Sequence, residues 1–202
     1  MVQAIVFDCF GVLYRDNAQM LYDLVKPEDF HKLQDVIHAI DHGFLTRDEY
    51  YQAVAEIGGV SIDVVKDVDS RQFSRNDELF SYVESLKPHY KLGLLSNVGQ
   101  GIMQQLFTVQ EREELFDAFV LSSEIGVTKP AVQAFDAVVA QLGVPAEETV
   151  MVDDLISNIE GAKLAGMNGV LFTSNQQVQQ ELGEFLASHA WASWSRNSQT
   201  WA

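Results

Sequence analysis

The sequence predicts an α/β protein built on a doubly wound parallel sheet, with a small helical segment inserted after the first strand. Two observations carry this prediction. Five short apolar runs have the length and flanking residues of buried strands, and the later runs alternate with segments of helical spacing. Residues 15–78, between the first two runs, contain helical patterns and no convincing strand. Strands that alternate with helices favour a parallel sheet covered on both faces.

The predicted elements follow from these patterns in chain order. Strands are expected over 4–7, 91–96, 118–123, 149–154 and 169–174. Helices are expected over 101–107, 131–143 and 157–167, and Gly143 and Gly166 stand near the ends of the last two.

The segment 15–78 carries its own helix signals. Pro27, followed by two acidic residues, is typical of a helix start. Thr46 with Glu49 three residues later predicts a capping box, in a helix that ends near Gly58. We therefore expect an α/β core from residues 1–14 and 79–202 and a helical insertion from residues 15–78.

The composition limits the classes of partner. The chain has 202 residues with 13 basic and 29 acidic side chains, a formal net charge of −16. Such a surface repels nucleic acids and anionic membranes, so neither is expected as a partner. If the substrate is an anion, the site must supply local positive charge, and a divalent metal would do so.

The remaining bulk features indicate a cytoplasmic protein. Cys9 is the only cysteine, so no intrachain disulfide can form. The first residues, "MVQAIVFD", lack the basic region and long apolar stretch of a signal peptide. No apolar run reaches the length of a transmembrane helix.

Polar residues with chemical potential follow the predicted strands. They are Asp8, Ser96 with Asn97, Lys129 after the third strand, and the pair Asp153 and Asp154. Each has a purely structural interpretation on its own, as a turn residue or a helix cap. The carboxyl ends of parallel strands meet at one edge, however, so we expect these side chains to converge there.

Together these residues predict a particular chemistry. They provide a candidate acidic nucleophile, a hydroxyl donor, a cation, and carboxylates that could hold a metal. Ligands made only of oxygen suit Mg²⁺. The five histidines are scattered along the chain and offer no zinc cluster.

Four motifs in this order resemble the haloacid dehalogenase superfamily of hydrolases over nearly the whole chain. They are "FDCFGVL", "LGLLSN", "GVTKPAVQAF" and "VMVDDLISNIEGAKLAGM". The resemblance implies a Rossmann-like core, and it implies that residues 15–78 form a small helical cap that closes over the site and selects the substrate.

The resemblance also implies roles for the acidic residues. Asp8 would attack phosphorus and form an aspartyl-phosphate. The Asp8 carboxylate and the backbone carbonyl of Phe10 would bind Mg²⁺ together with Asp154. Asp153 or Asn158 would support the metal directly or through water.

The other motif residues would handle the phosphoryl group. Ser96 and the backbone near Asn97 would donate hydrogen bonds to its oxygens. Lys129 would stabilise both Asp8 and the transferring group, and Gly11 would allow a tight turn after the nucleophile. A small phosphorylated metabolite is the partner that these roles imply.

Phe10 departs from the family pattern. Most phosphatases of the family carry a second Asp there, which protonates the leaving group, and such proton transfer typically contributes about 10²–10⁴-fold. A related group with small caps, including a glucose-1-phosphate phosphatase, also lacks this Asp and has a fourth motif similar to "DDLISNIEGA". A Mg²⁺-dependent phosphatase of a sugar phosphate is therefore the favoured function.

Two alternatives stay open. One is a 2-haloacid dehalogenase, because those members carry an aromatic residue where Phe10 stands; their fourth motif, however, has lost the paired acids. The other is a binding module with weak or no catalysis. Tyr14, Arg15, His42 and Arg47 are candidates to face a substrate, although surface placement is the plainer expectation for each. The tail 191–202, with all three Trp residues, would either dock on the core or stay loose.

Overall fold

A five-stranded parallel sheet forms the centre of the molecule and confirms the predicted fold class. A computed structural model describes residues 1–197, with side chains up to residue 187. The strand order is β5-β4-β1-β6-β7, and every neighbouring pair is parallel. The strands are β1 (Ala4–Phe7), β4 (Lys91–Ser96), β5 (Ala118–Leu121), β6 (Thr149–Asp153) and β7 (Asn168–Leu171).

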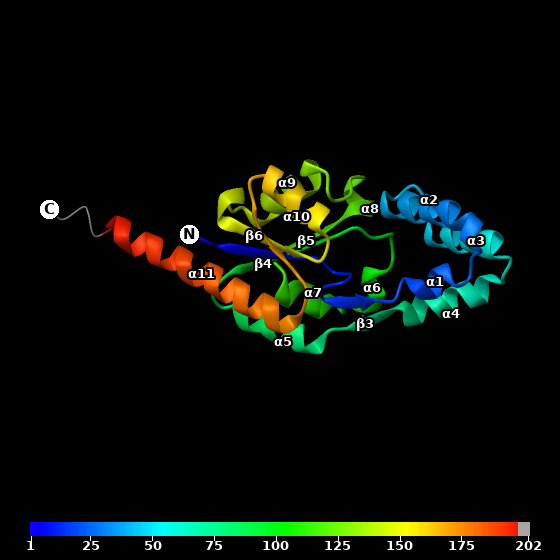
Figure 1. The fold of residues 1–202 in the computed structure, drawn as a ribbon, viewed down its shortest axis with the longest axis horizontal. Coiled ribbons are helices and arrows are strands. Elements are labelled where there is room, and N and C mark those ends of the chain that lie inside the picture. Colours follow the sequence, from blue (N-terminus) through cyan, green and yellow to red (C-terminus); the bar gives the residue numbers. More distant parts are fainter. Residues whose placement is uncertain (198–202) are drawn as a thin grey trace.

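Helices cover both faces of this sheet (Figure 1). On one face lie α9 (Val132–Leu142) and α10 (Ile156–Leu164), which pack against β4 to β7. On the other lie α5 (Asp77–Leu86), α6 (Met103–Leu106), α7 (Val109–Leu115) and the first turns of α11 (Asn175–Asn197). The strands are buried almost throughout, because apolar side chains meet a helix layer on each side.

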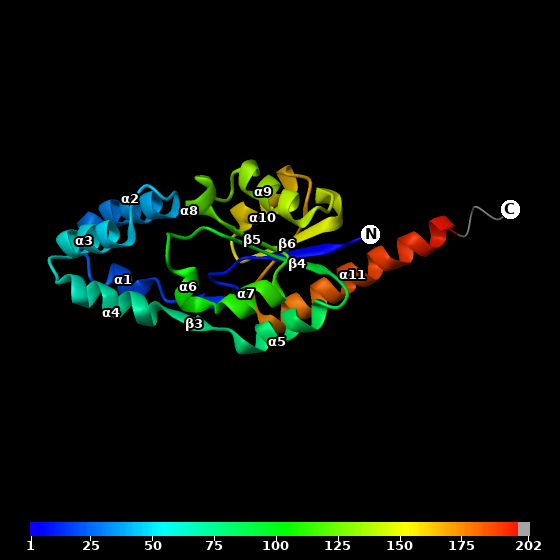
Figure 2. The ribbon, with the colours of Figure 1, turned by 180° about the vertical axis from the view of Figure 1, so that it is seen from behind.

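The four helices of the insertion gather beyond the carboxyl ends of the strands, as Figures 1 and 2 show. They are α1 (Gln19–Tyr22), α2 (Phe30–Asp41), α3 (Arg47–Gly58) and α4 (Ile62–Gln72), with a 3₁₀ turn over Pro27–Asp29. Their apolar side chains form a hydrophobic cluster of their own. The predicted capping box is confirmed, since the Thr46 hydroxyl and the Glu49 carboxylate cap α3 reciprocally.

The expectation that residues 15–78 contain no strand is wrong. Strands β2 (Tyr14–Asp16) and β3 (Phe73–Arg75) pair antiparallel at the two points where the chain enters and leaves the insertion. Each has only three residues, and one partner lies about 60 positions from the other, with Tyr14 opposite Arg75. Such short strands carry little local signal, because distant pairing stabilises them.

Other boundaries shift by a few residues. The strand predicted over 118–123 ends at Leu121, because Ser122–Ile125 form the short helix α8. The strand predicted over 149–154 ends at Asp153, which leaves Asp154 beyond the sheet. A second 3₁₀ turn, Ala146–Glu148, precedes β6.

Three further sequence expectations concern Cys9, the tryptophans of the tail and transmembrane helices. Cys9 is buried and unpaired, as expected. Trp201 and the side chains of Trp191 and Trp194 lie outside the described residues. None of the helices in the described part of the chain is long and apolar enough to span a bilayer.

Candidate active site

The register of the sheet places two acids side by side at its carboxyl edge. Phe7 at the end of β1 is level with Val152 of β6, so the residues that follow them, Asp8 and Asp153, are neighbours. The Asp8 amide donates to the Val152 carbonyl at 2.9 Å, which extends the ladder by one bond. The acids predicted from separate motifs therefore meet at the centre of the sheet.

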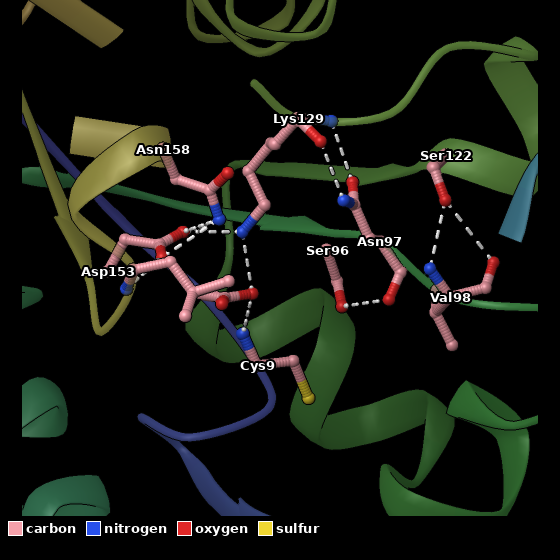
Figure 3. Close-up of polar contacts among 10 residues, drawn as sticks. Cys9, Ser96, Asn97, Val98, Ser122, Lys129, Asp153 and Asn158 are labelled. Carbon is pink, nitrogen blue, oxygen red and sulfur yellow. Dashed lines mark hydrogen bonds and ion pairs between the residues drawn. The ribbon is translucent and has the colours of Figure 1, made fainter. Parts of the chain in front are cut away.

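Lys129 joins these two acids. Its ammonium lies 2.7 Å from Asp8 Oδ1 and 2.6 Å from Asp153 Oδ2, and its side chain is only 1% exposed. Figure 3 shows the lysine reaching from its loop toward Asp153. The buried ammonium therefore pairs with both carboxylates at once, and the three ionised groups together keep one negative charge.

Each oxygen of the Asp153 carboxylate accepts two hydrogen bonds. Its Oδ1 accepts from the Leu155 amide and from Asn158 Nδ2, both at 2.9 Å. Its Oδ2 accepts from Lys129 and, at 3.1 Å, from Asn158 Nδ2. Asp153 is 0% exposed. Asn158 thus holds Asp153, and Asp153 in turn orients Lys129.

Asp154 is the open carboxylate of the pair. It is half-buried and lines a cavity of about 430 Å³ together with Asp8 and Lys129. Gly11 lies directly against it: a Cβ on Gly11 would stand 2.3 Å from Asp154 Oδ2, and the backbone there has φ +83°. Glycine is required at this position on both grounds.

Asn97 fixes the loop that carries Lys129. Its Nδ2 donates to the Lys129 carbonyl at 2.9 Å, and its Oδ1 accepts from the Lys129 amide at 2.8 Å. Asn97 also lines the cavity. Ser96, in contrast, is fully buried, and its hydroxyl contacts the Asn97 carbonyl at 3.5 Å rather than lining the cavity wall (Figure 3).

Two cavity acids were missed by sequence reasoning. Asp16 at the end of β2 and Asp41 at the end of α2 line the same cavity as Asp8. Asp41 did carry a signal, because an acid in the last turn of a helix opposes the helix dipole and calls for an explanation. Asp16 carried none, since nothing local indicated that β2 forms.

The electrostatics of the cluster favour an added cation. Burial, helped by the Asp153 charge, raises the pKa of Asp8 to about 7 against the lowering effect of Lys129. Burial also raises the pKa of Asp154, and Asp153 adds to the rise. Burial lowers the pKa of Lys129, but Asp8 and Asp153 outweigh it, so the net direction is upward.

The donor set fits a magnesium ion. Carboxylate oxygens of Asp8, Asp153 and Asp154 lie within 4.8 Å of one another. Three carboxylates and one ammonium leave two negative charges if all are ionised. A small divalent cation with a preference for oxygen ligands would balance them.

The ring of Phe10 contacts another aromatic ring. It packs against Phe73 in a tilted arrangement, with ring centroids 4.5 Å apart and an interplanar angle of 35°. Phe10 also lines the cavity. The position of the usual second acid is therefore part of an aromatic pair between the core and β3.

The four residues considered as substrate contacts lie in different surroundings. Tyr14 is buried, and its hydroxyl donates to the Leu106 carbonyl at 2.5 Å. Arg15 is exposed and lines a separate hollow on the other side of Gly11. His42 contacts the His38 carbonyl through Nδ1 and Thr128 through Nε2. Arg47 lines a cavity next to the site, where it pairs with Asp69.

Comparison with known proteins agrees with this geometry. The family described as haloacid dehalogenase-like hydrolase matches residues 31–172. A D-ribitol-5-phosphate phosphatase of Bacteroides thetaiotaomicron is 27% identical, over 93% of this chain and 100% of its own. The sesquiterpene phosphatase astK of Aspergillus oryzae is 24% identical, over 91% of this chain and 96% of its own.

A longer relative matches as well. The drimenol cyclase drtB of Aspergillus calidoustus is 28% identical over 94% of this chain. This chain spans only 38% of the length of that protein.

Solved structures share the fold. A haloacid dehalogenase family enzyme of Bacteroides thetaiotaomicron has a TM-score of 0.77 at 21% identity, covering 86% of this chain and 95% of its own. The same enzyme has been solved with magnesium and inorganic phosphate, with a TM-score of 0.74 at 19% identity over 87% and 96% of the two chains. The L-2-haloacid dehalogenase of Xanthobacter autotrophicus has a TM-score of 0.61 at 20% identity, over 91% and 83%.

Proposed function

The chain belongs to the haloacid dehalogenase-like hydrolase family, and given this membership we propose that it is a Mg²⁺-dependent phosphatase of small phosphorylated metabolites. The observation that carries the proposal is the buried Asp8–Lys129–Asp153 cluster beside the open carboxylate of Asp154. A cluster of this kind positions one acid for attack and leaves another to meet a cation.

In the proposed reaction Asp8 is the nucleophile. A bond forms between an Asp8 oxygen and phosphorus, and the bond from phosphorus to the alcohol oxygen breaks. Because Phe10 cannot protonate it, the departing alcohol oxygen takes its proton from water. Water then hydrolyses the aspartyl-phosphate and regenerates Asp8. Lys129 holds Asp8 in place from 2.7 Å and offsets negative charge as the phosphoryl group transfers.

The metal would be held by Asp8, Asp154 and the backbone carbonyl of Phe10, with Asp153 contributing from the same cluster. Bound there, it would supply the positive charge that allows a phosphate to approach a carboxylate. Asn158 keeps Asp153 oriented through its two contacts. Gly11 leaves room for Asp154.

We propose that Ser96 and the main chain at Asn97 bind the phosphoryl oxygens. Asn97 already lines the cavity. Ser96 would contribute after its hydroxyl turns from the Asn97 carbonyl toward the cavity. The helical insertion 15–78 is proposed to act as the cap that covers this site, since Asp16 and Asp41 reach the cavity from it.

The relatives differ in the alcohol part of the substrate. One is named for ribitol 5-phosphate and another for sesquiterpenes. A test of the proposed function should therefore use a panel of substrates that contains both the sugar phosphates favoured by the sequence and apolar monophosphates.

The experiment measures phosphate release from p-nitrophenyl phosphate and from the panel, with and without Mg²⁺. We expect release that depends on Mg²⁺ and that falls by about 10³-fold or more in Asp8→Asn, because the nucleophile is lost. Glu113→Gln is the matched control, since Glu113 is exposed on α7 and outside the cavity.

The alternatives are built into the same assay. Halide release from 2-chloropropionate without metal would show a dehalogenase. If no substrate releases phosphate or halide while Mg²⁺ still binds, the protein is a binding module. An Asp8→Asn rate equal to that of the unaltered protein would refute the proposed mechanism.

A further inference from the structure

A second cavity opens from the site into the helical insertion. It has a volume of about 250 Å³ and shares four lining residues with the cavity at Asp8. The shared residues are Phe10, Asp16, Asp41 and Asn97. A phosphate ester with its phosphorus near Asp8 would therefore extend its alcohol part into this second cavity, which we call the cap cavity.

The walls of the cap cavity are predominantly apolar. Six of its apolar lining side chains come from the insertion and from the loop after β4: Leu21, Tyr22, Ile37, Ile40, Tyr50 and Ile102. The paired rings of Phe10 and Phe73 line it as well. The aromatic residue that replaces the usual acid therefore extends an apolar surface.

Several polar side chains that line the cap cavity, Arg47, Asp69 and Gln72 among them, are engaged with other protein groups. Arg47 binds the carboxylate of Asp69, and its Nε donates to the Tyr51 hydroxyl at 2.9 Å, which in turn donates to Asp69. Gln72 Nε2 donates to Asp16 Oδ1 at 2.8 Å.

Asn97 is engaged in the same way, since its side-chain amide binds the main chain of Lys129 on both sides. A sugar brings several hydroxyl groups that lose water on entry. At Arg47, Gln72 and Asn97 they would meet groups that already have partners, which is costly.

The charge of the cap cavity argues against a second anionic group. Its ionisable lining groups are Asp16, Asp41, Asp69 and Arg47, and Arg47 is already paired with Asp69. No basic side chain among the described lining residues is left to balance a second anionic group. A diphosphate or a phosphorylated carboxylic acid would therefore be disfavoured there.

We propose that the cap cavity receives an uncharged, predominantly apolar alcohol group, so that the substrates are monophosphate esters of aliphatic or aromatic alcohols. This inference rests on the proposed phosphatase function and names the substrate class of the same site. The sugar phosphates favoured by the sequence are, on this view, poor substrates.

The test compares kcat/KM at saturating Mg²⁺ for straight-chain alkyl monophosphates of increasing length, for glucose 1-phosphate and for p-nitrophenyl phosphate. We expect kcat/KM to rise by about fourfold for each added methylene until the cavity is filled, and then to level off. The best alkyl phosphate should exceed glucose 1-phosphate by about 100-fold or more.

A wall variant ties the preference to the cap cavity. Ile37→Ser should lower kcat/KM for the best alkyl phosphate by about tenfold and leave kcat/KM for methyl phosphate unchanged. Ile37→Leu, which keeps the side chain apolar, should retain the kcat/KM values of the unaltered protein. Leu164→Ser is the control, because Leu164 is 80% exposed on α10 and away from the cavity. The thermal midpoint of each variant checks that it folds.

The outcomes separate the two proposals. A flat response to chain length, or a preference for glucose 1-phosphate, overturns the apolar-substrate inference while the phosphatase function stands. Failure to hydrolyse any phosphate ester, p-nitrophenyl phosphate included, overturns the proposed function and the inference with it.

Discussion

Phe10 joins two features of the molecule that the sequence presents separately. It stands two residues after Asp8, where a second acid would be expected, and its ring lies against Phe73 of β3. The ring lines both the cavity at Asp8 and the cap cavity. A phenylalanine at this position extends the apolar wall of the cap cavity but cannot donate a proton to the leaving group. One side chain cannot do both.

Gly11 offers the sharpest test of the metal site. Gly11→Ala would place a Cβ 2.3 Å from Asp154 Oδ2 and so push that carboxylate aside. We expect Mg²⁺ affinity to fall by roughly 10–100-fold, as for other losses of support to a ligand. Calorimetric titration with Mg²⁺ measures it.

Gly143→Ala is the matched control for that change. Gly143 also has a positive φ, +61°, but a Cβ added there would have nothing within 4 Å of it. This variant should lose stability of about 1 kcal/mol and keep its Mg²⁺ affinity. Equal losses of Mg²⁺ affinity in both variants would mean that backbone strain, not contact with Asp154, is responsible.

Asp41 should make the stability of the fold depend on pH. Burial raises its pKa from 3.8 to about 7. Between these values the folded state binds a proton that the unfolded chain has lost, so this group lowers the free energy of unfolding as pH rises from about 4 to about 7. Above that range the destabilisation is complete.

Asp41→Asn removes the ionisable group. The variant should therefore match the unaltered protein near pH 4 and exceed its free energy of unfolding by about 2–4 kcal/mol at pH 8. Urea unfolding at both pH values measures the difference. Asp35→Asn, exposed on the same helix, controls for the removal of a carboxylate from α2. A gain for Asp41→Asn that is the same at both pH values would contradict the assignment.

At the scale of elements, the helical insertion is tied to the core at two places. The β2–β3 pair carries both chain crossings. The end of α2 makes the second contact, where the Ser122 hydroxyl donates to the Asp41 carbonyl at 2.5 Å and accepts from the Val98 amide at 2.9 Å. These contacts hold the wall that carries Asp16 and Asp41 against the site.

Within the insertion, α3 and α4 are joined by a buried ion pair. Arg47 on α3 binds Asp69 on α4, and the Tyr51 hydroxyl donates to the same carboxylate at 3.0 Å. Asp69→Asn should lower the free energy of unfolding by about 2–4 kcal/mol, because it leaves a largely buried guanidinium without its counter-charge. Urea unfolding measures the loss.

Asp67→Asn provides the control on the same helix. Asp67 also pairs with an arginine, Arg71, but the two side chains are 62% and 59% exposed. Its loss should cost less than about 0.5 kcal/mol. If the two substitutions lowered the free energy of unfolding equally, burial would not explain the contribution of the Arg47–Asp69 pair to stability.

At the scale of the whole molecule, the net charge of −16 opposes the approach of a phosphate. Lys129 and a metal held by the cluster would offset that charge near Asp8. Long-range repulsion is screened by salt, whereas contacts inside a buried site are screened much less.

The reaction should therefore respond to salt in an unusual direction. With Mg²⁺ kept saturating, kcat/KM for a phosphate monoester should rise on the order of two- to fivefold between about 10 mM and about 200 mM ionic strength. Steady-state kinetics at several NaCl concentrations measure this. A steady fall with salt would show that the field at the entrance attracts anions.

The parallel sheet and the acid cluster could be predicted from the chain's residues without its coordinates. Asp8, Lys129 and Asp153 lie in separate motifs, but each follows a strand of a parallel sheet, and parallel strands bring their carboxyl ends to one edge. The capping box at Thr46 was equally readable, because its two residues lie within one helical turn.

The surroundings of that cluster, in contrast, follow from tertiary packing. β2 and β3 pair across the whole insertion, and that pairing carries Asp16 and Phe73 to the site from distant parts of the chain. The apolar lining of the cap cavity is likewise shared between the core and the insertion. A strand signal is local, whereas a cavity is a relation among segments far apart in sequence, and it exists only once they have packed.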